Sequence, residues 1–184
     1  MVRIFLSLAT LSIALLATTL VVGLLIGDLT AAVTEETLQF KTMHFLLGVL
    51  SALVVVLVNS IGITYFIGTS RWCKEVVETY KLDRNLIARS AQLKRKAFPW
   101  ALCGMLTIVG VISLGAAADP VTKAATGIED TSVWRDIHFA AALAGMSLIA
   151  WSYYMLWTKV NLNQAIINDV MTEVKQVRDE RGLE

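Results

Sequence analysis

The sequence contains little charge, little proline and no excess of basic residues. Its 184 residues include 2 prolines and 17% charged residues, whereas 56% are hydrophobic. Soluble domains carry about 25% charged and about 45–50% apolar residues, so this composition disfavours a soluble globular domain. The formal net charge of +1 provides no basic field, and we therefore do not expect nucleic acid as a partner.

Several motifs that define enzymes and metal sites are also missing. The two cysteines, Cys73 and Cys103, belong to no CxxCH sequence and to no cluster of metal-ligand residues. This excludes c-type haem attachment and disfavours zinc and iron–sulfur sites. The chain has no HExxH sequence, no phosphate-binding loop and no nucleophile–base arrangement. An electron-transfer or structural subunit is therefore favoured over an independent enzyme.

The sequence does contain four long apolar stretches, at about residues 4–26, 43–68, 97–118 and 137–157. About 20 apolar residues suffice for a helix to cross a bilayer. None of the stretches contains Asp, Glu, Lys or Arg, which argues against an ion pathway. The first is too long for the h-region of a signal peptide, so we expect it to be retained. We predict an all-α integral membrane protein whose residues 1–160 form a four-helix transmembrane bundle in the lipid bilayer.

The connecting segments differ in charge, which predicts the orientation of the bundle. The segment from Arg71 to Lys96 holds eight basic and three acidic residues, whereas acidic residues outnumber basic ones in the other two connections. Basic residues in short loops remain on the cytoplasmic side. We therefore expect both termini and the middle segment to be cytoplasmic, in a bacterial inner membrane. Both cysteines then lie near the reducing side, where a disulfide is not expected.

The cytoplasmic segments have helical patterns of their own. Residues 69–97 predict a helical hairpin that turns at Lys81–Asp83, with Asp83 as the N-cap of the second helix. Pro99 is expected to kink the start of the third span or to lie near its first turn. Residues 161–184 predict a cytoplasmic amphipathic helix that packs on the hairpin, the alternatives being an external partner, an oligomer contact or a lipid surface. Its apolar seam comprises Ile167, Val170, Val174 and Val177.

The only two histidines of the chain occupy matching positions. His44 opens the second apolar stretch and His138 opens the fourth; each is followed by Phe and preceded, three residues earlier, by a basic residue. Small residues lie four and seven positions after each histidine. This match predicts a two-fold internal repeat of helix pairs, with chance similarity as the alternative. The matched residues are Lys41, Gly48 and Ser51 in the first copy, and Arg135, Ala142 and Gly145 in the second.

The repeat places both histidines at one depth, near the outer face, on helices that are diagonal in an up-and-down bundle. Two facing imidazoles are suitable axial ligands for a flat macrocycle. The small residues Gly48, Ser51, Ala142 and Gly145 would leave space for its edges, and Lys41 and Arg135 would meet its propionates. The arrangement resembles small four-helix membrane b-type cytochromes and the haem-bearing anchors of respiratory enzymes. The resemblance implies one bis-histidine haem b, whose iron His44 and His138 bind, although these histidines lie at the outermost helical turn instead of deeper.

Several other interpretations remain open from the residues alone. Either histidine fits an ordinary polar residue at the membrane interface, and the small residues fit close helix packing. A quinone pocket near the outer face is compatible with a haem, and Asn59, Thr64 and Tyr65 are further polar groups that would hold a ligand. The chief alternative function is a non-catalytic assembly subunit without haem. Such a subunit would hold other membrane or redox subunits, or copies of itself, through its cytoplasmic helices.

Overall fold

The computed structural model describes residues 1–26, 34–119 and 132–182, and all regular structure in these ranges is α-helical. The four helices are α1 (Val2–Leu24), α2 (Glu35–Tyr80), α3 (Asn85–Ala118) and α5 (Ser132–Glu180). Each of them is long and apolar enough to span a membrane. The prediction of an all-helical chain with four membrane-length helices is therefore confirmed for the described residues.

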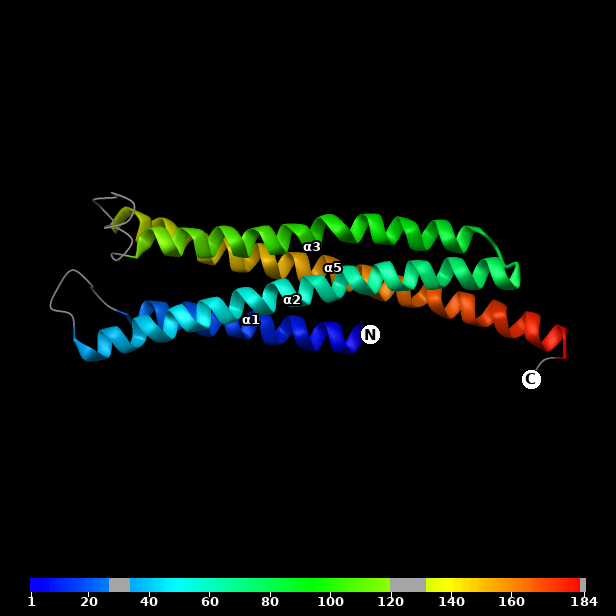
Figure 1. Cartoon of the computed structure of the whole chain (residues 1–184), viewed down its shortest axis with the longest axis horizontal. Coiled ribbons are helices and arrows are strands. Elements are labelled where there is room, and N and C mark those ends of the chain that lie inside the picture. The colour runs from blue at the N-terminus through cyan, green and yellow to red at the C-terminus, as the bar shows by residue number, and fades with distance from the viewer. Residues whose placement is uncertain (27–33, 120–131, 183–184) are drawn as a thin grey trace.

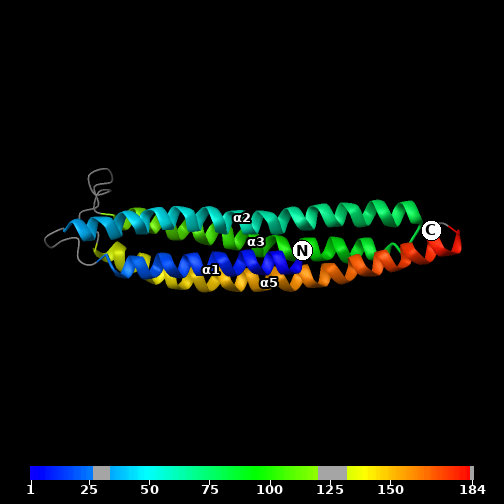
Figure 2. The same ribbon diagram turned by 90° about the horizontal axis from the view of Figure 1, so that it is seen from below.

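The helices lie side by side along one axis and form an elongated bundle (Figure 1). Helix α1 packs against α2 and α5, and α3 packs against the same two helices. Within the described ranges the backbones of α1 and α3 do not lie next to each other. The order around the bundle is therefore α1, α2, α3, α5, which places the two histidine-bearing helices, α2 and α5, on one diagonal (Figures 1 and 2).

The outer surface of the bundle is strongly apolar. Leu11 of α1, Phe45 and Leu53 of α2, and Leu106 of α3 are 60–65% exposed. Soluble monomers rarely expose continuous apolar surface on this scale, because water favours its burial. Lipid tails provide the matching environment, so the four helices fit an integral membrane protein.

Three of the helices continue beyond their apolar stretches. A helix rises about 1.5 Å per residue, so the 46 residues of α2 extend for about 70 Å, more than twice the roughly 30 Å of a hydrocarbon core. Helix α1 begins near the middle of the bundle, where Figure 1 marks the N-terminus, and does not extend into the other half. We call the remaining three-helix part the stalk, formed by residues 69–80 of α2, 85–96 of α3 and 161–180 of α5.

The stalk has its own hydrophobic core. Residues from all three helices meet there: Cys73, Val77, Leu86, Ile166, Val170 and Val174. Residues 161–180 of α5 therefore pack on the hairpin of α2 and α3, as expected, but the buried residues differ in part from the predicted seam. Ile166 is buried in place of Ile167, and Val177 lies at the margin. The reason is that α5 runs unbroken from Ser132 to Glu180, so the buried face of the stalk continues the face that Tyr153, Leu156 and Val160 bury in the main core.

The turn between α2 and α3 uses residues suited to it. Lys81 ends α2 in the left-handed conformation at φ 59°, and its backbone N–H donates to the Val77 carbonyl. The N-cap of α3 is Arg84, not Asp83 as predicted, because the helix begins one residue later, at Asn85. The Asp83 carboxylate still accepts a hydrogen bond from the Asn85 N–H at 2.9 Å. Pro99 lies inside α3, not near its first turn, because the helix already begins at Asn85.

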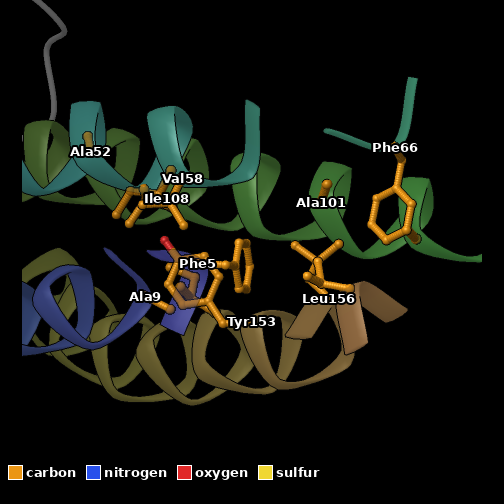
Figure 3. Close-up of a cluster of buried hydrophobic side chains, with 13 residues drawn as sticks. Phe5, Ala9, Ala52, Val58, Phe66, Ala101, Ile108, Tyr153 and Leu156 are labelled. Carbon is orange, nitrogen blue, oxygen red and sulfur yellow. The ribbon is translucent and has the colours of Figure 1, made fainter. Parts of the chain in front are cut away.

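The main core fills the membrane-length part of the bundle with side chains from all four helices (Figure 3). Phe5 of α1 lies edge-on to Tyr153 of α5, with ring centres 6.3 Å apart. Polar side chains in this core pair across helices: the Ser12 and Tyr153 hydroxyls lie 2.9 Å apart, and the Ser152 hydroxyl donates to the Trp100 carbonyl at 2.6 Å. Such bonds satisfy polar groups that no water reaches.

Candidate functional site

The two histidines meet inside the bundle. His44 of α2 and His138 of α5 are half-buried, and their ring centres lie 6.2 Å apart with the ring planes at 81° to each other. The chain has no further histidine. The structure therefore brings the two residues together from opposite corners of the helix order, although they are far apart in the sequence.

Each imidazole is held by a backbone carbonyl of the preceding helix. His44 Nδ1 lies 2.9 Å from the Thr19 carbonyl oxygen of α1, and His138 Nδ1 lies 3.1 Å from the Val111 carbonyl oxygen of α3. A carbonyl oxygen can only accept a hydrogen bond, so Nδ1 carries the proton and donates it. This tautomer leaves the lone pair on Nε2, which is the arrangement that prepares a histidine to bind a metal.

A glycine lies against the face of each imidazole. A Cβ atom added to Gly23 of α1 would lie 2.8 Å from His44 Cε1, and one added to Gly115 of α3 would lie 2.9 Å from His138 Cε1. Only glycine therefore allows each ring to approach the neighbouring helix so closely. Each glycine lies one helical turn after the residue whose carbonyl accepts the hydrogen bond from the histidine, so the two helix pairs support their histidines in the same way.

These glycines contact the histidines, and the sequence analysis did not identify them. Gly23 has a Gly-xxx-Gly spacing with Gly27 that is typical of close helix packing, whereas Gly115 has no glycine four residues away. One sequence signal does distinguish them: each lies near the end of an apolar stretch and precedes the next histidine by 21 and 23 residues, respectively. Similar spacing is expected for two helical hairpins in each of which a glycine of the first helix lies opposite the histidine of the second.

A small cavity of about 60 Å³ lies beside the histidine pair. Five of the residues proposed from the sequence line it, namely His44, Gly48, Ser51, His138 and Ala142, and the remaining wall is mainly apolar. Gly48 faces open space, since an added Cβ would have no atom within 4 Å. Ser51 is buried, and its hydroxyl lies 2.9 Å from that of Thr19, so it also joins α2 to α1.

The other three proposed residues lie outside this cavity. Gly145 allows α5 to approach α3, because an added Cβ would lie 2.6 Å from Val111 Cγ2. Lys41 donates to the Asp119 carboxylate at 2.9 Å and thereby joins α2 to the end of α3. Arg135 contacts the neighbouring Asp136 at 3.3 Å, and both side chains are largely exposed.

The polar residues considered for a quinone are separated from the histidine pair. Asn59 is fully buried; its amide donates to the Val55 carbonyl, whereas its Oδ1 has no hydrogen-bond partner. Tyr65 instead accepts a hydrogen bond from Asn163 at 3.1 Å, and Thr64 is exposed. In the described ranges these three side chains do not line the cavity beside the histidines.

Groups of three or more His, Cys, Asp or Glu side chains placed to hold a metal ion are absent from residues 1–26, 34–119 and 132–182. Cys73 and Cys103 are both free. Comparison with protein-family models, with curated proteins and with solved structures finds no match to this chain. The histidine pair is thus the one arrangement of potential metal ligands in the described part of the chain that has a matched, preorganised geometry.

Proposed function

We propose that this chain is a b-type cytochrome-like electron-transfer subunit of a membrane, with His44 and His138 as the two axial ligands of one haem iron. The observation that supports this most is the geometry of the pair. Metal–imidazole bonds are about 2 Å long, so two rings that bind one metal from opposite sides have centres about 6 Å apart. The observed separation is 6.2 Å, and both Nε2 atoms carry the lone pair.

The surroundings of the pair fit a haem in part. Small-molecule sites usually measure about 300–1,000 Å³, whereas the cavity here measures about 60 Å³. A macrocycle therefore requires its apolar walls to separate. Leu20 of α1 and the flexible Met146 of α5 line the cavity. The backbones of α1 and α3 are not adjacent in the described ranges, so side chains alone separate the two helices across that diagonal.

Each protein group has a defined part in this proposal. The bound haem would supply reversible one-electron transfer. His44 and His138 would hold it, and the Thr19 and Val111 carbonyls would orient the two imidazoles and make them more basic ligands. Lys41 and Arg135, one helical turn before the histidines, would neutralise its propionates after exchanging their present carboxylate partners.

The orientation of the chain is part of the same proposal. The stalk carries most of the basic residues of the connecting segments, and basic segments stay cytoplasmic. With the stalk and both termini in the cytoplasm of a bacterial inner membrane, the histidine pair lies near the outer face. Such a haem would exchange electrons with an outer redox partner or a quinol, and a single haem at that depth would not carry them across the bilayer.

The visible spectrum of the purified full chain tests this proposal. The chain is produced in cells supplied with a haem precursor and compared with the single variants His44→Ala and His138→Ala. Thr42→Ala is the control, because Thr42 is exposed two residues from His44 and its hydroxyl bonds to the Leu38 carbonyl of its own helix. Sharp reduced-state bands in the parent and the control, lost in both histidine variants, are expected. A folded, colourless parent would favour the assembly-subunit alternative instead.

A further inference from the structure

A second and larger cavity lies at the other end of the apolar spans. It measures about 380 Å³ and opens where α2 and α3 pass from the spans into the stalk. We call it the Pro99 groove. Its apolar walls include Ile63, Phe66, Ile67, Phe98 and Pro99, and the first turns of the stalk contribute Lys94 and Arg95. The volume falls within the usual range for a bound small molecule, about 300–1,000 Å³.

The charge at this groove is not neutralised by the protein. In the described part of the chain, neither Lys94 nor Arg95 has a carboxylate within ion-pair distance, whereas three other stalk cations, Arg71, Lys74 and Arg89, are paired with acids. Pro99 has no N–H to donate to the Arg95 carbonyl one turn earlier. The groove therefore joins an apolar slot to two unpaired cations.

We propose that the Pro99 groove binds one anionic phospholipid, with its phosphate against Lys94 and Arg95 and an acyl chain along Ile63, Ile67 and Phe98. The groove lies where the charge-free spans meet the basic segment, which is the depth of lipid headgroups. Ile67 and Phe98 are 54% and 51% exposed, so the slot is open toward the surrounding lipid. Basic pockets between membrane helices are known to hold anionic headgroups in this way.

Native mass spectrometry of the delipidated full chain tests the headgroup. The chain is incubated with equal amounts of phosphatidylglycerol and phosphatidylcholine that carry the same acyl chains. Each basic residue near an anionic lipid contributes about fivefold, so two cations predict a preference of about 25-fold for the anionic lipid. The variant Lys94→Gln/Arg95→Gln is expected to lose this preference. The control Arg84→Gln/Lys175→Gln removes the same charge from two exposed positions that do not line the groove, one in the turn before α3 and one in the stalk, and should keep the preference.

Filling the slot tests the acyl chain. Ile67→Trp places bulk in the groove, whereas Leu57→Trp places it on an equally exposed position of α2 that does not line the groove. We expect the first variant to retain less of both lipids and the second to match the parent. Equal retention of the two lipids by the parent, equal losses in the two charge variants, or full retention by Ile67→Trp would overturn the proposal. None of these outcomes depends on whether the chain binds haem.

Discussion

The glycine contacts offer the sharpest test of how the histidines are positioned, and Gly115→Ala is the most informative change. The new Cβ would lie 2.9 Å from His138 Cε1 and 3.3 Å from Nε2. Carbon atoms pack best at about 3.5–4.0 Å, so the imidazole must move by roughly half an ångström or more. That movement strains the 3.1 Å hydrogen bond from His138 Nδ1 to the Val111 carbonyl.

The energetic terms can be compared. Overpacking usually costs about 1–3 kcal/mol, and a weakened hydrogen bond costs about 0.5–1.5 kcal/mol. Alanine is favoured over glycine inside a helix by about 1 kcal/mol, which offsets part of this cost. The expected net loss is about 0.5–3.5 kcal/mol in the free energy of unfolding, together with a clear loss of haem affinity if His138 binds iron.

Helix α3 supplies a matched control. Gly110 lies in the same helix, and a Cβ added there would meet no atom within 4 Å. Gly110→Ala should therefore gain the helix-propensity term alone, about 1 kcal/mol. Both variants are measured by denaturant unfolding in the same detergent, and haemin binding is titrated in parallel. If Gly115→Ala were as stable as Gly110→Ala and bound haemin equally well, the position of the His138 imidazole would not depend on Gly115.

Three further predictions concern the stalk and the ion pair near the site. Val170→Ala should lower the free energy of unfolding by about 1–3 kcal/mol, because Val170 is fully buried, whereas Met171→Ala at the exposed neighbouring position should change it by less than about 0.5 kcal/mol; equal effects in denaturant unfolding would contradict the stalk core. Lys41 and Asp119 are partly exposed, so a double-mutant cycle should give a coupling of only about 0–1 kcal/mol, and a much larger coupling would show that the pair is effectively buried. Burial raises the pKa of the Cys73 thiol, so in the unfolded chain the thiol ionises first as the pH rises. The stability of the parent relative to Cys73→Ala should therefore be constant below about pH 8.5 and should fall above it; a difference that stayed constant to pH 10 in denaturant unfolding would refute this.

The sequence predicted the helices well because the signal is physical and local. Charge-free stretches of about 20 residues have few alternatives to a buried or membrane helix, and all four became helices. The meeting of His44 and His138 followed from their matched neighbours and from short connections between antiparallel helices. The turn at Lys81–Asp83 was also recognisable, since its residues suit a helix end and a new start.

The remaining details depend on how helices rotate and slide against one another. Gly23 and Gly115 contact the histidines only because α1 and α3 are offset by particular amounts, which no local pattern specifies. A small residue such as Gly145 or Ser51 either allows two helices to approach or leaves room for a ligand. Sequence spacing alone does not distinguish these two roles. The buried seam of the stalk includes Ile166 and not Ile167. Because α5 is one continuous helix, the face that it buries in the membrane-length part also determines the face that it buries in the stalk.

The most direct test of the central claim is a haemin titration of the purified full chain in detergent, followed by its visible absorption. If His44 and His138 both bind the iron, the parent should saturate at one haem per chain with the spectrum of a six-coordinate iron, and the His44→Ala/His138→Ala double variant should form no such species. The double variant must retain its helical content and the size of the parent particle. Equal haem binding by the parent and the double variant, or no haem binding by a folded parent, would contradict a haem site formed by His44 and His138.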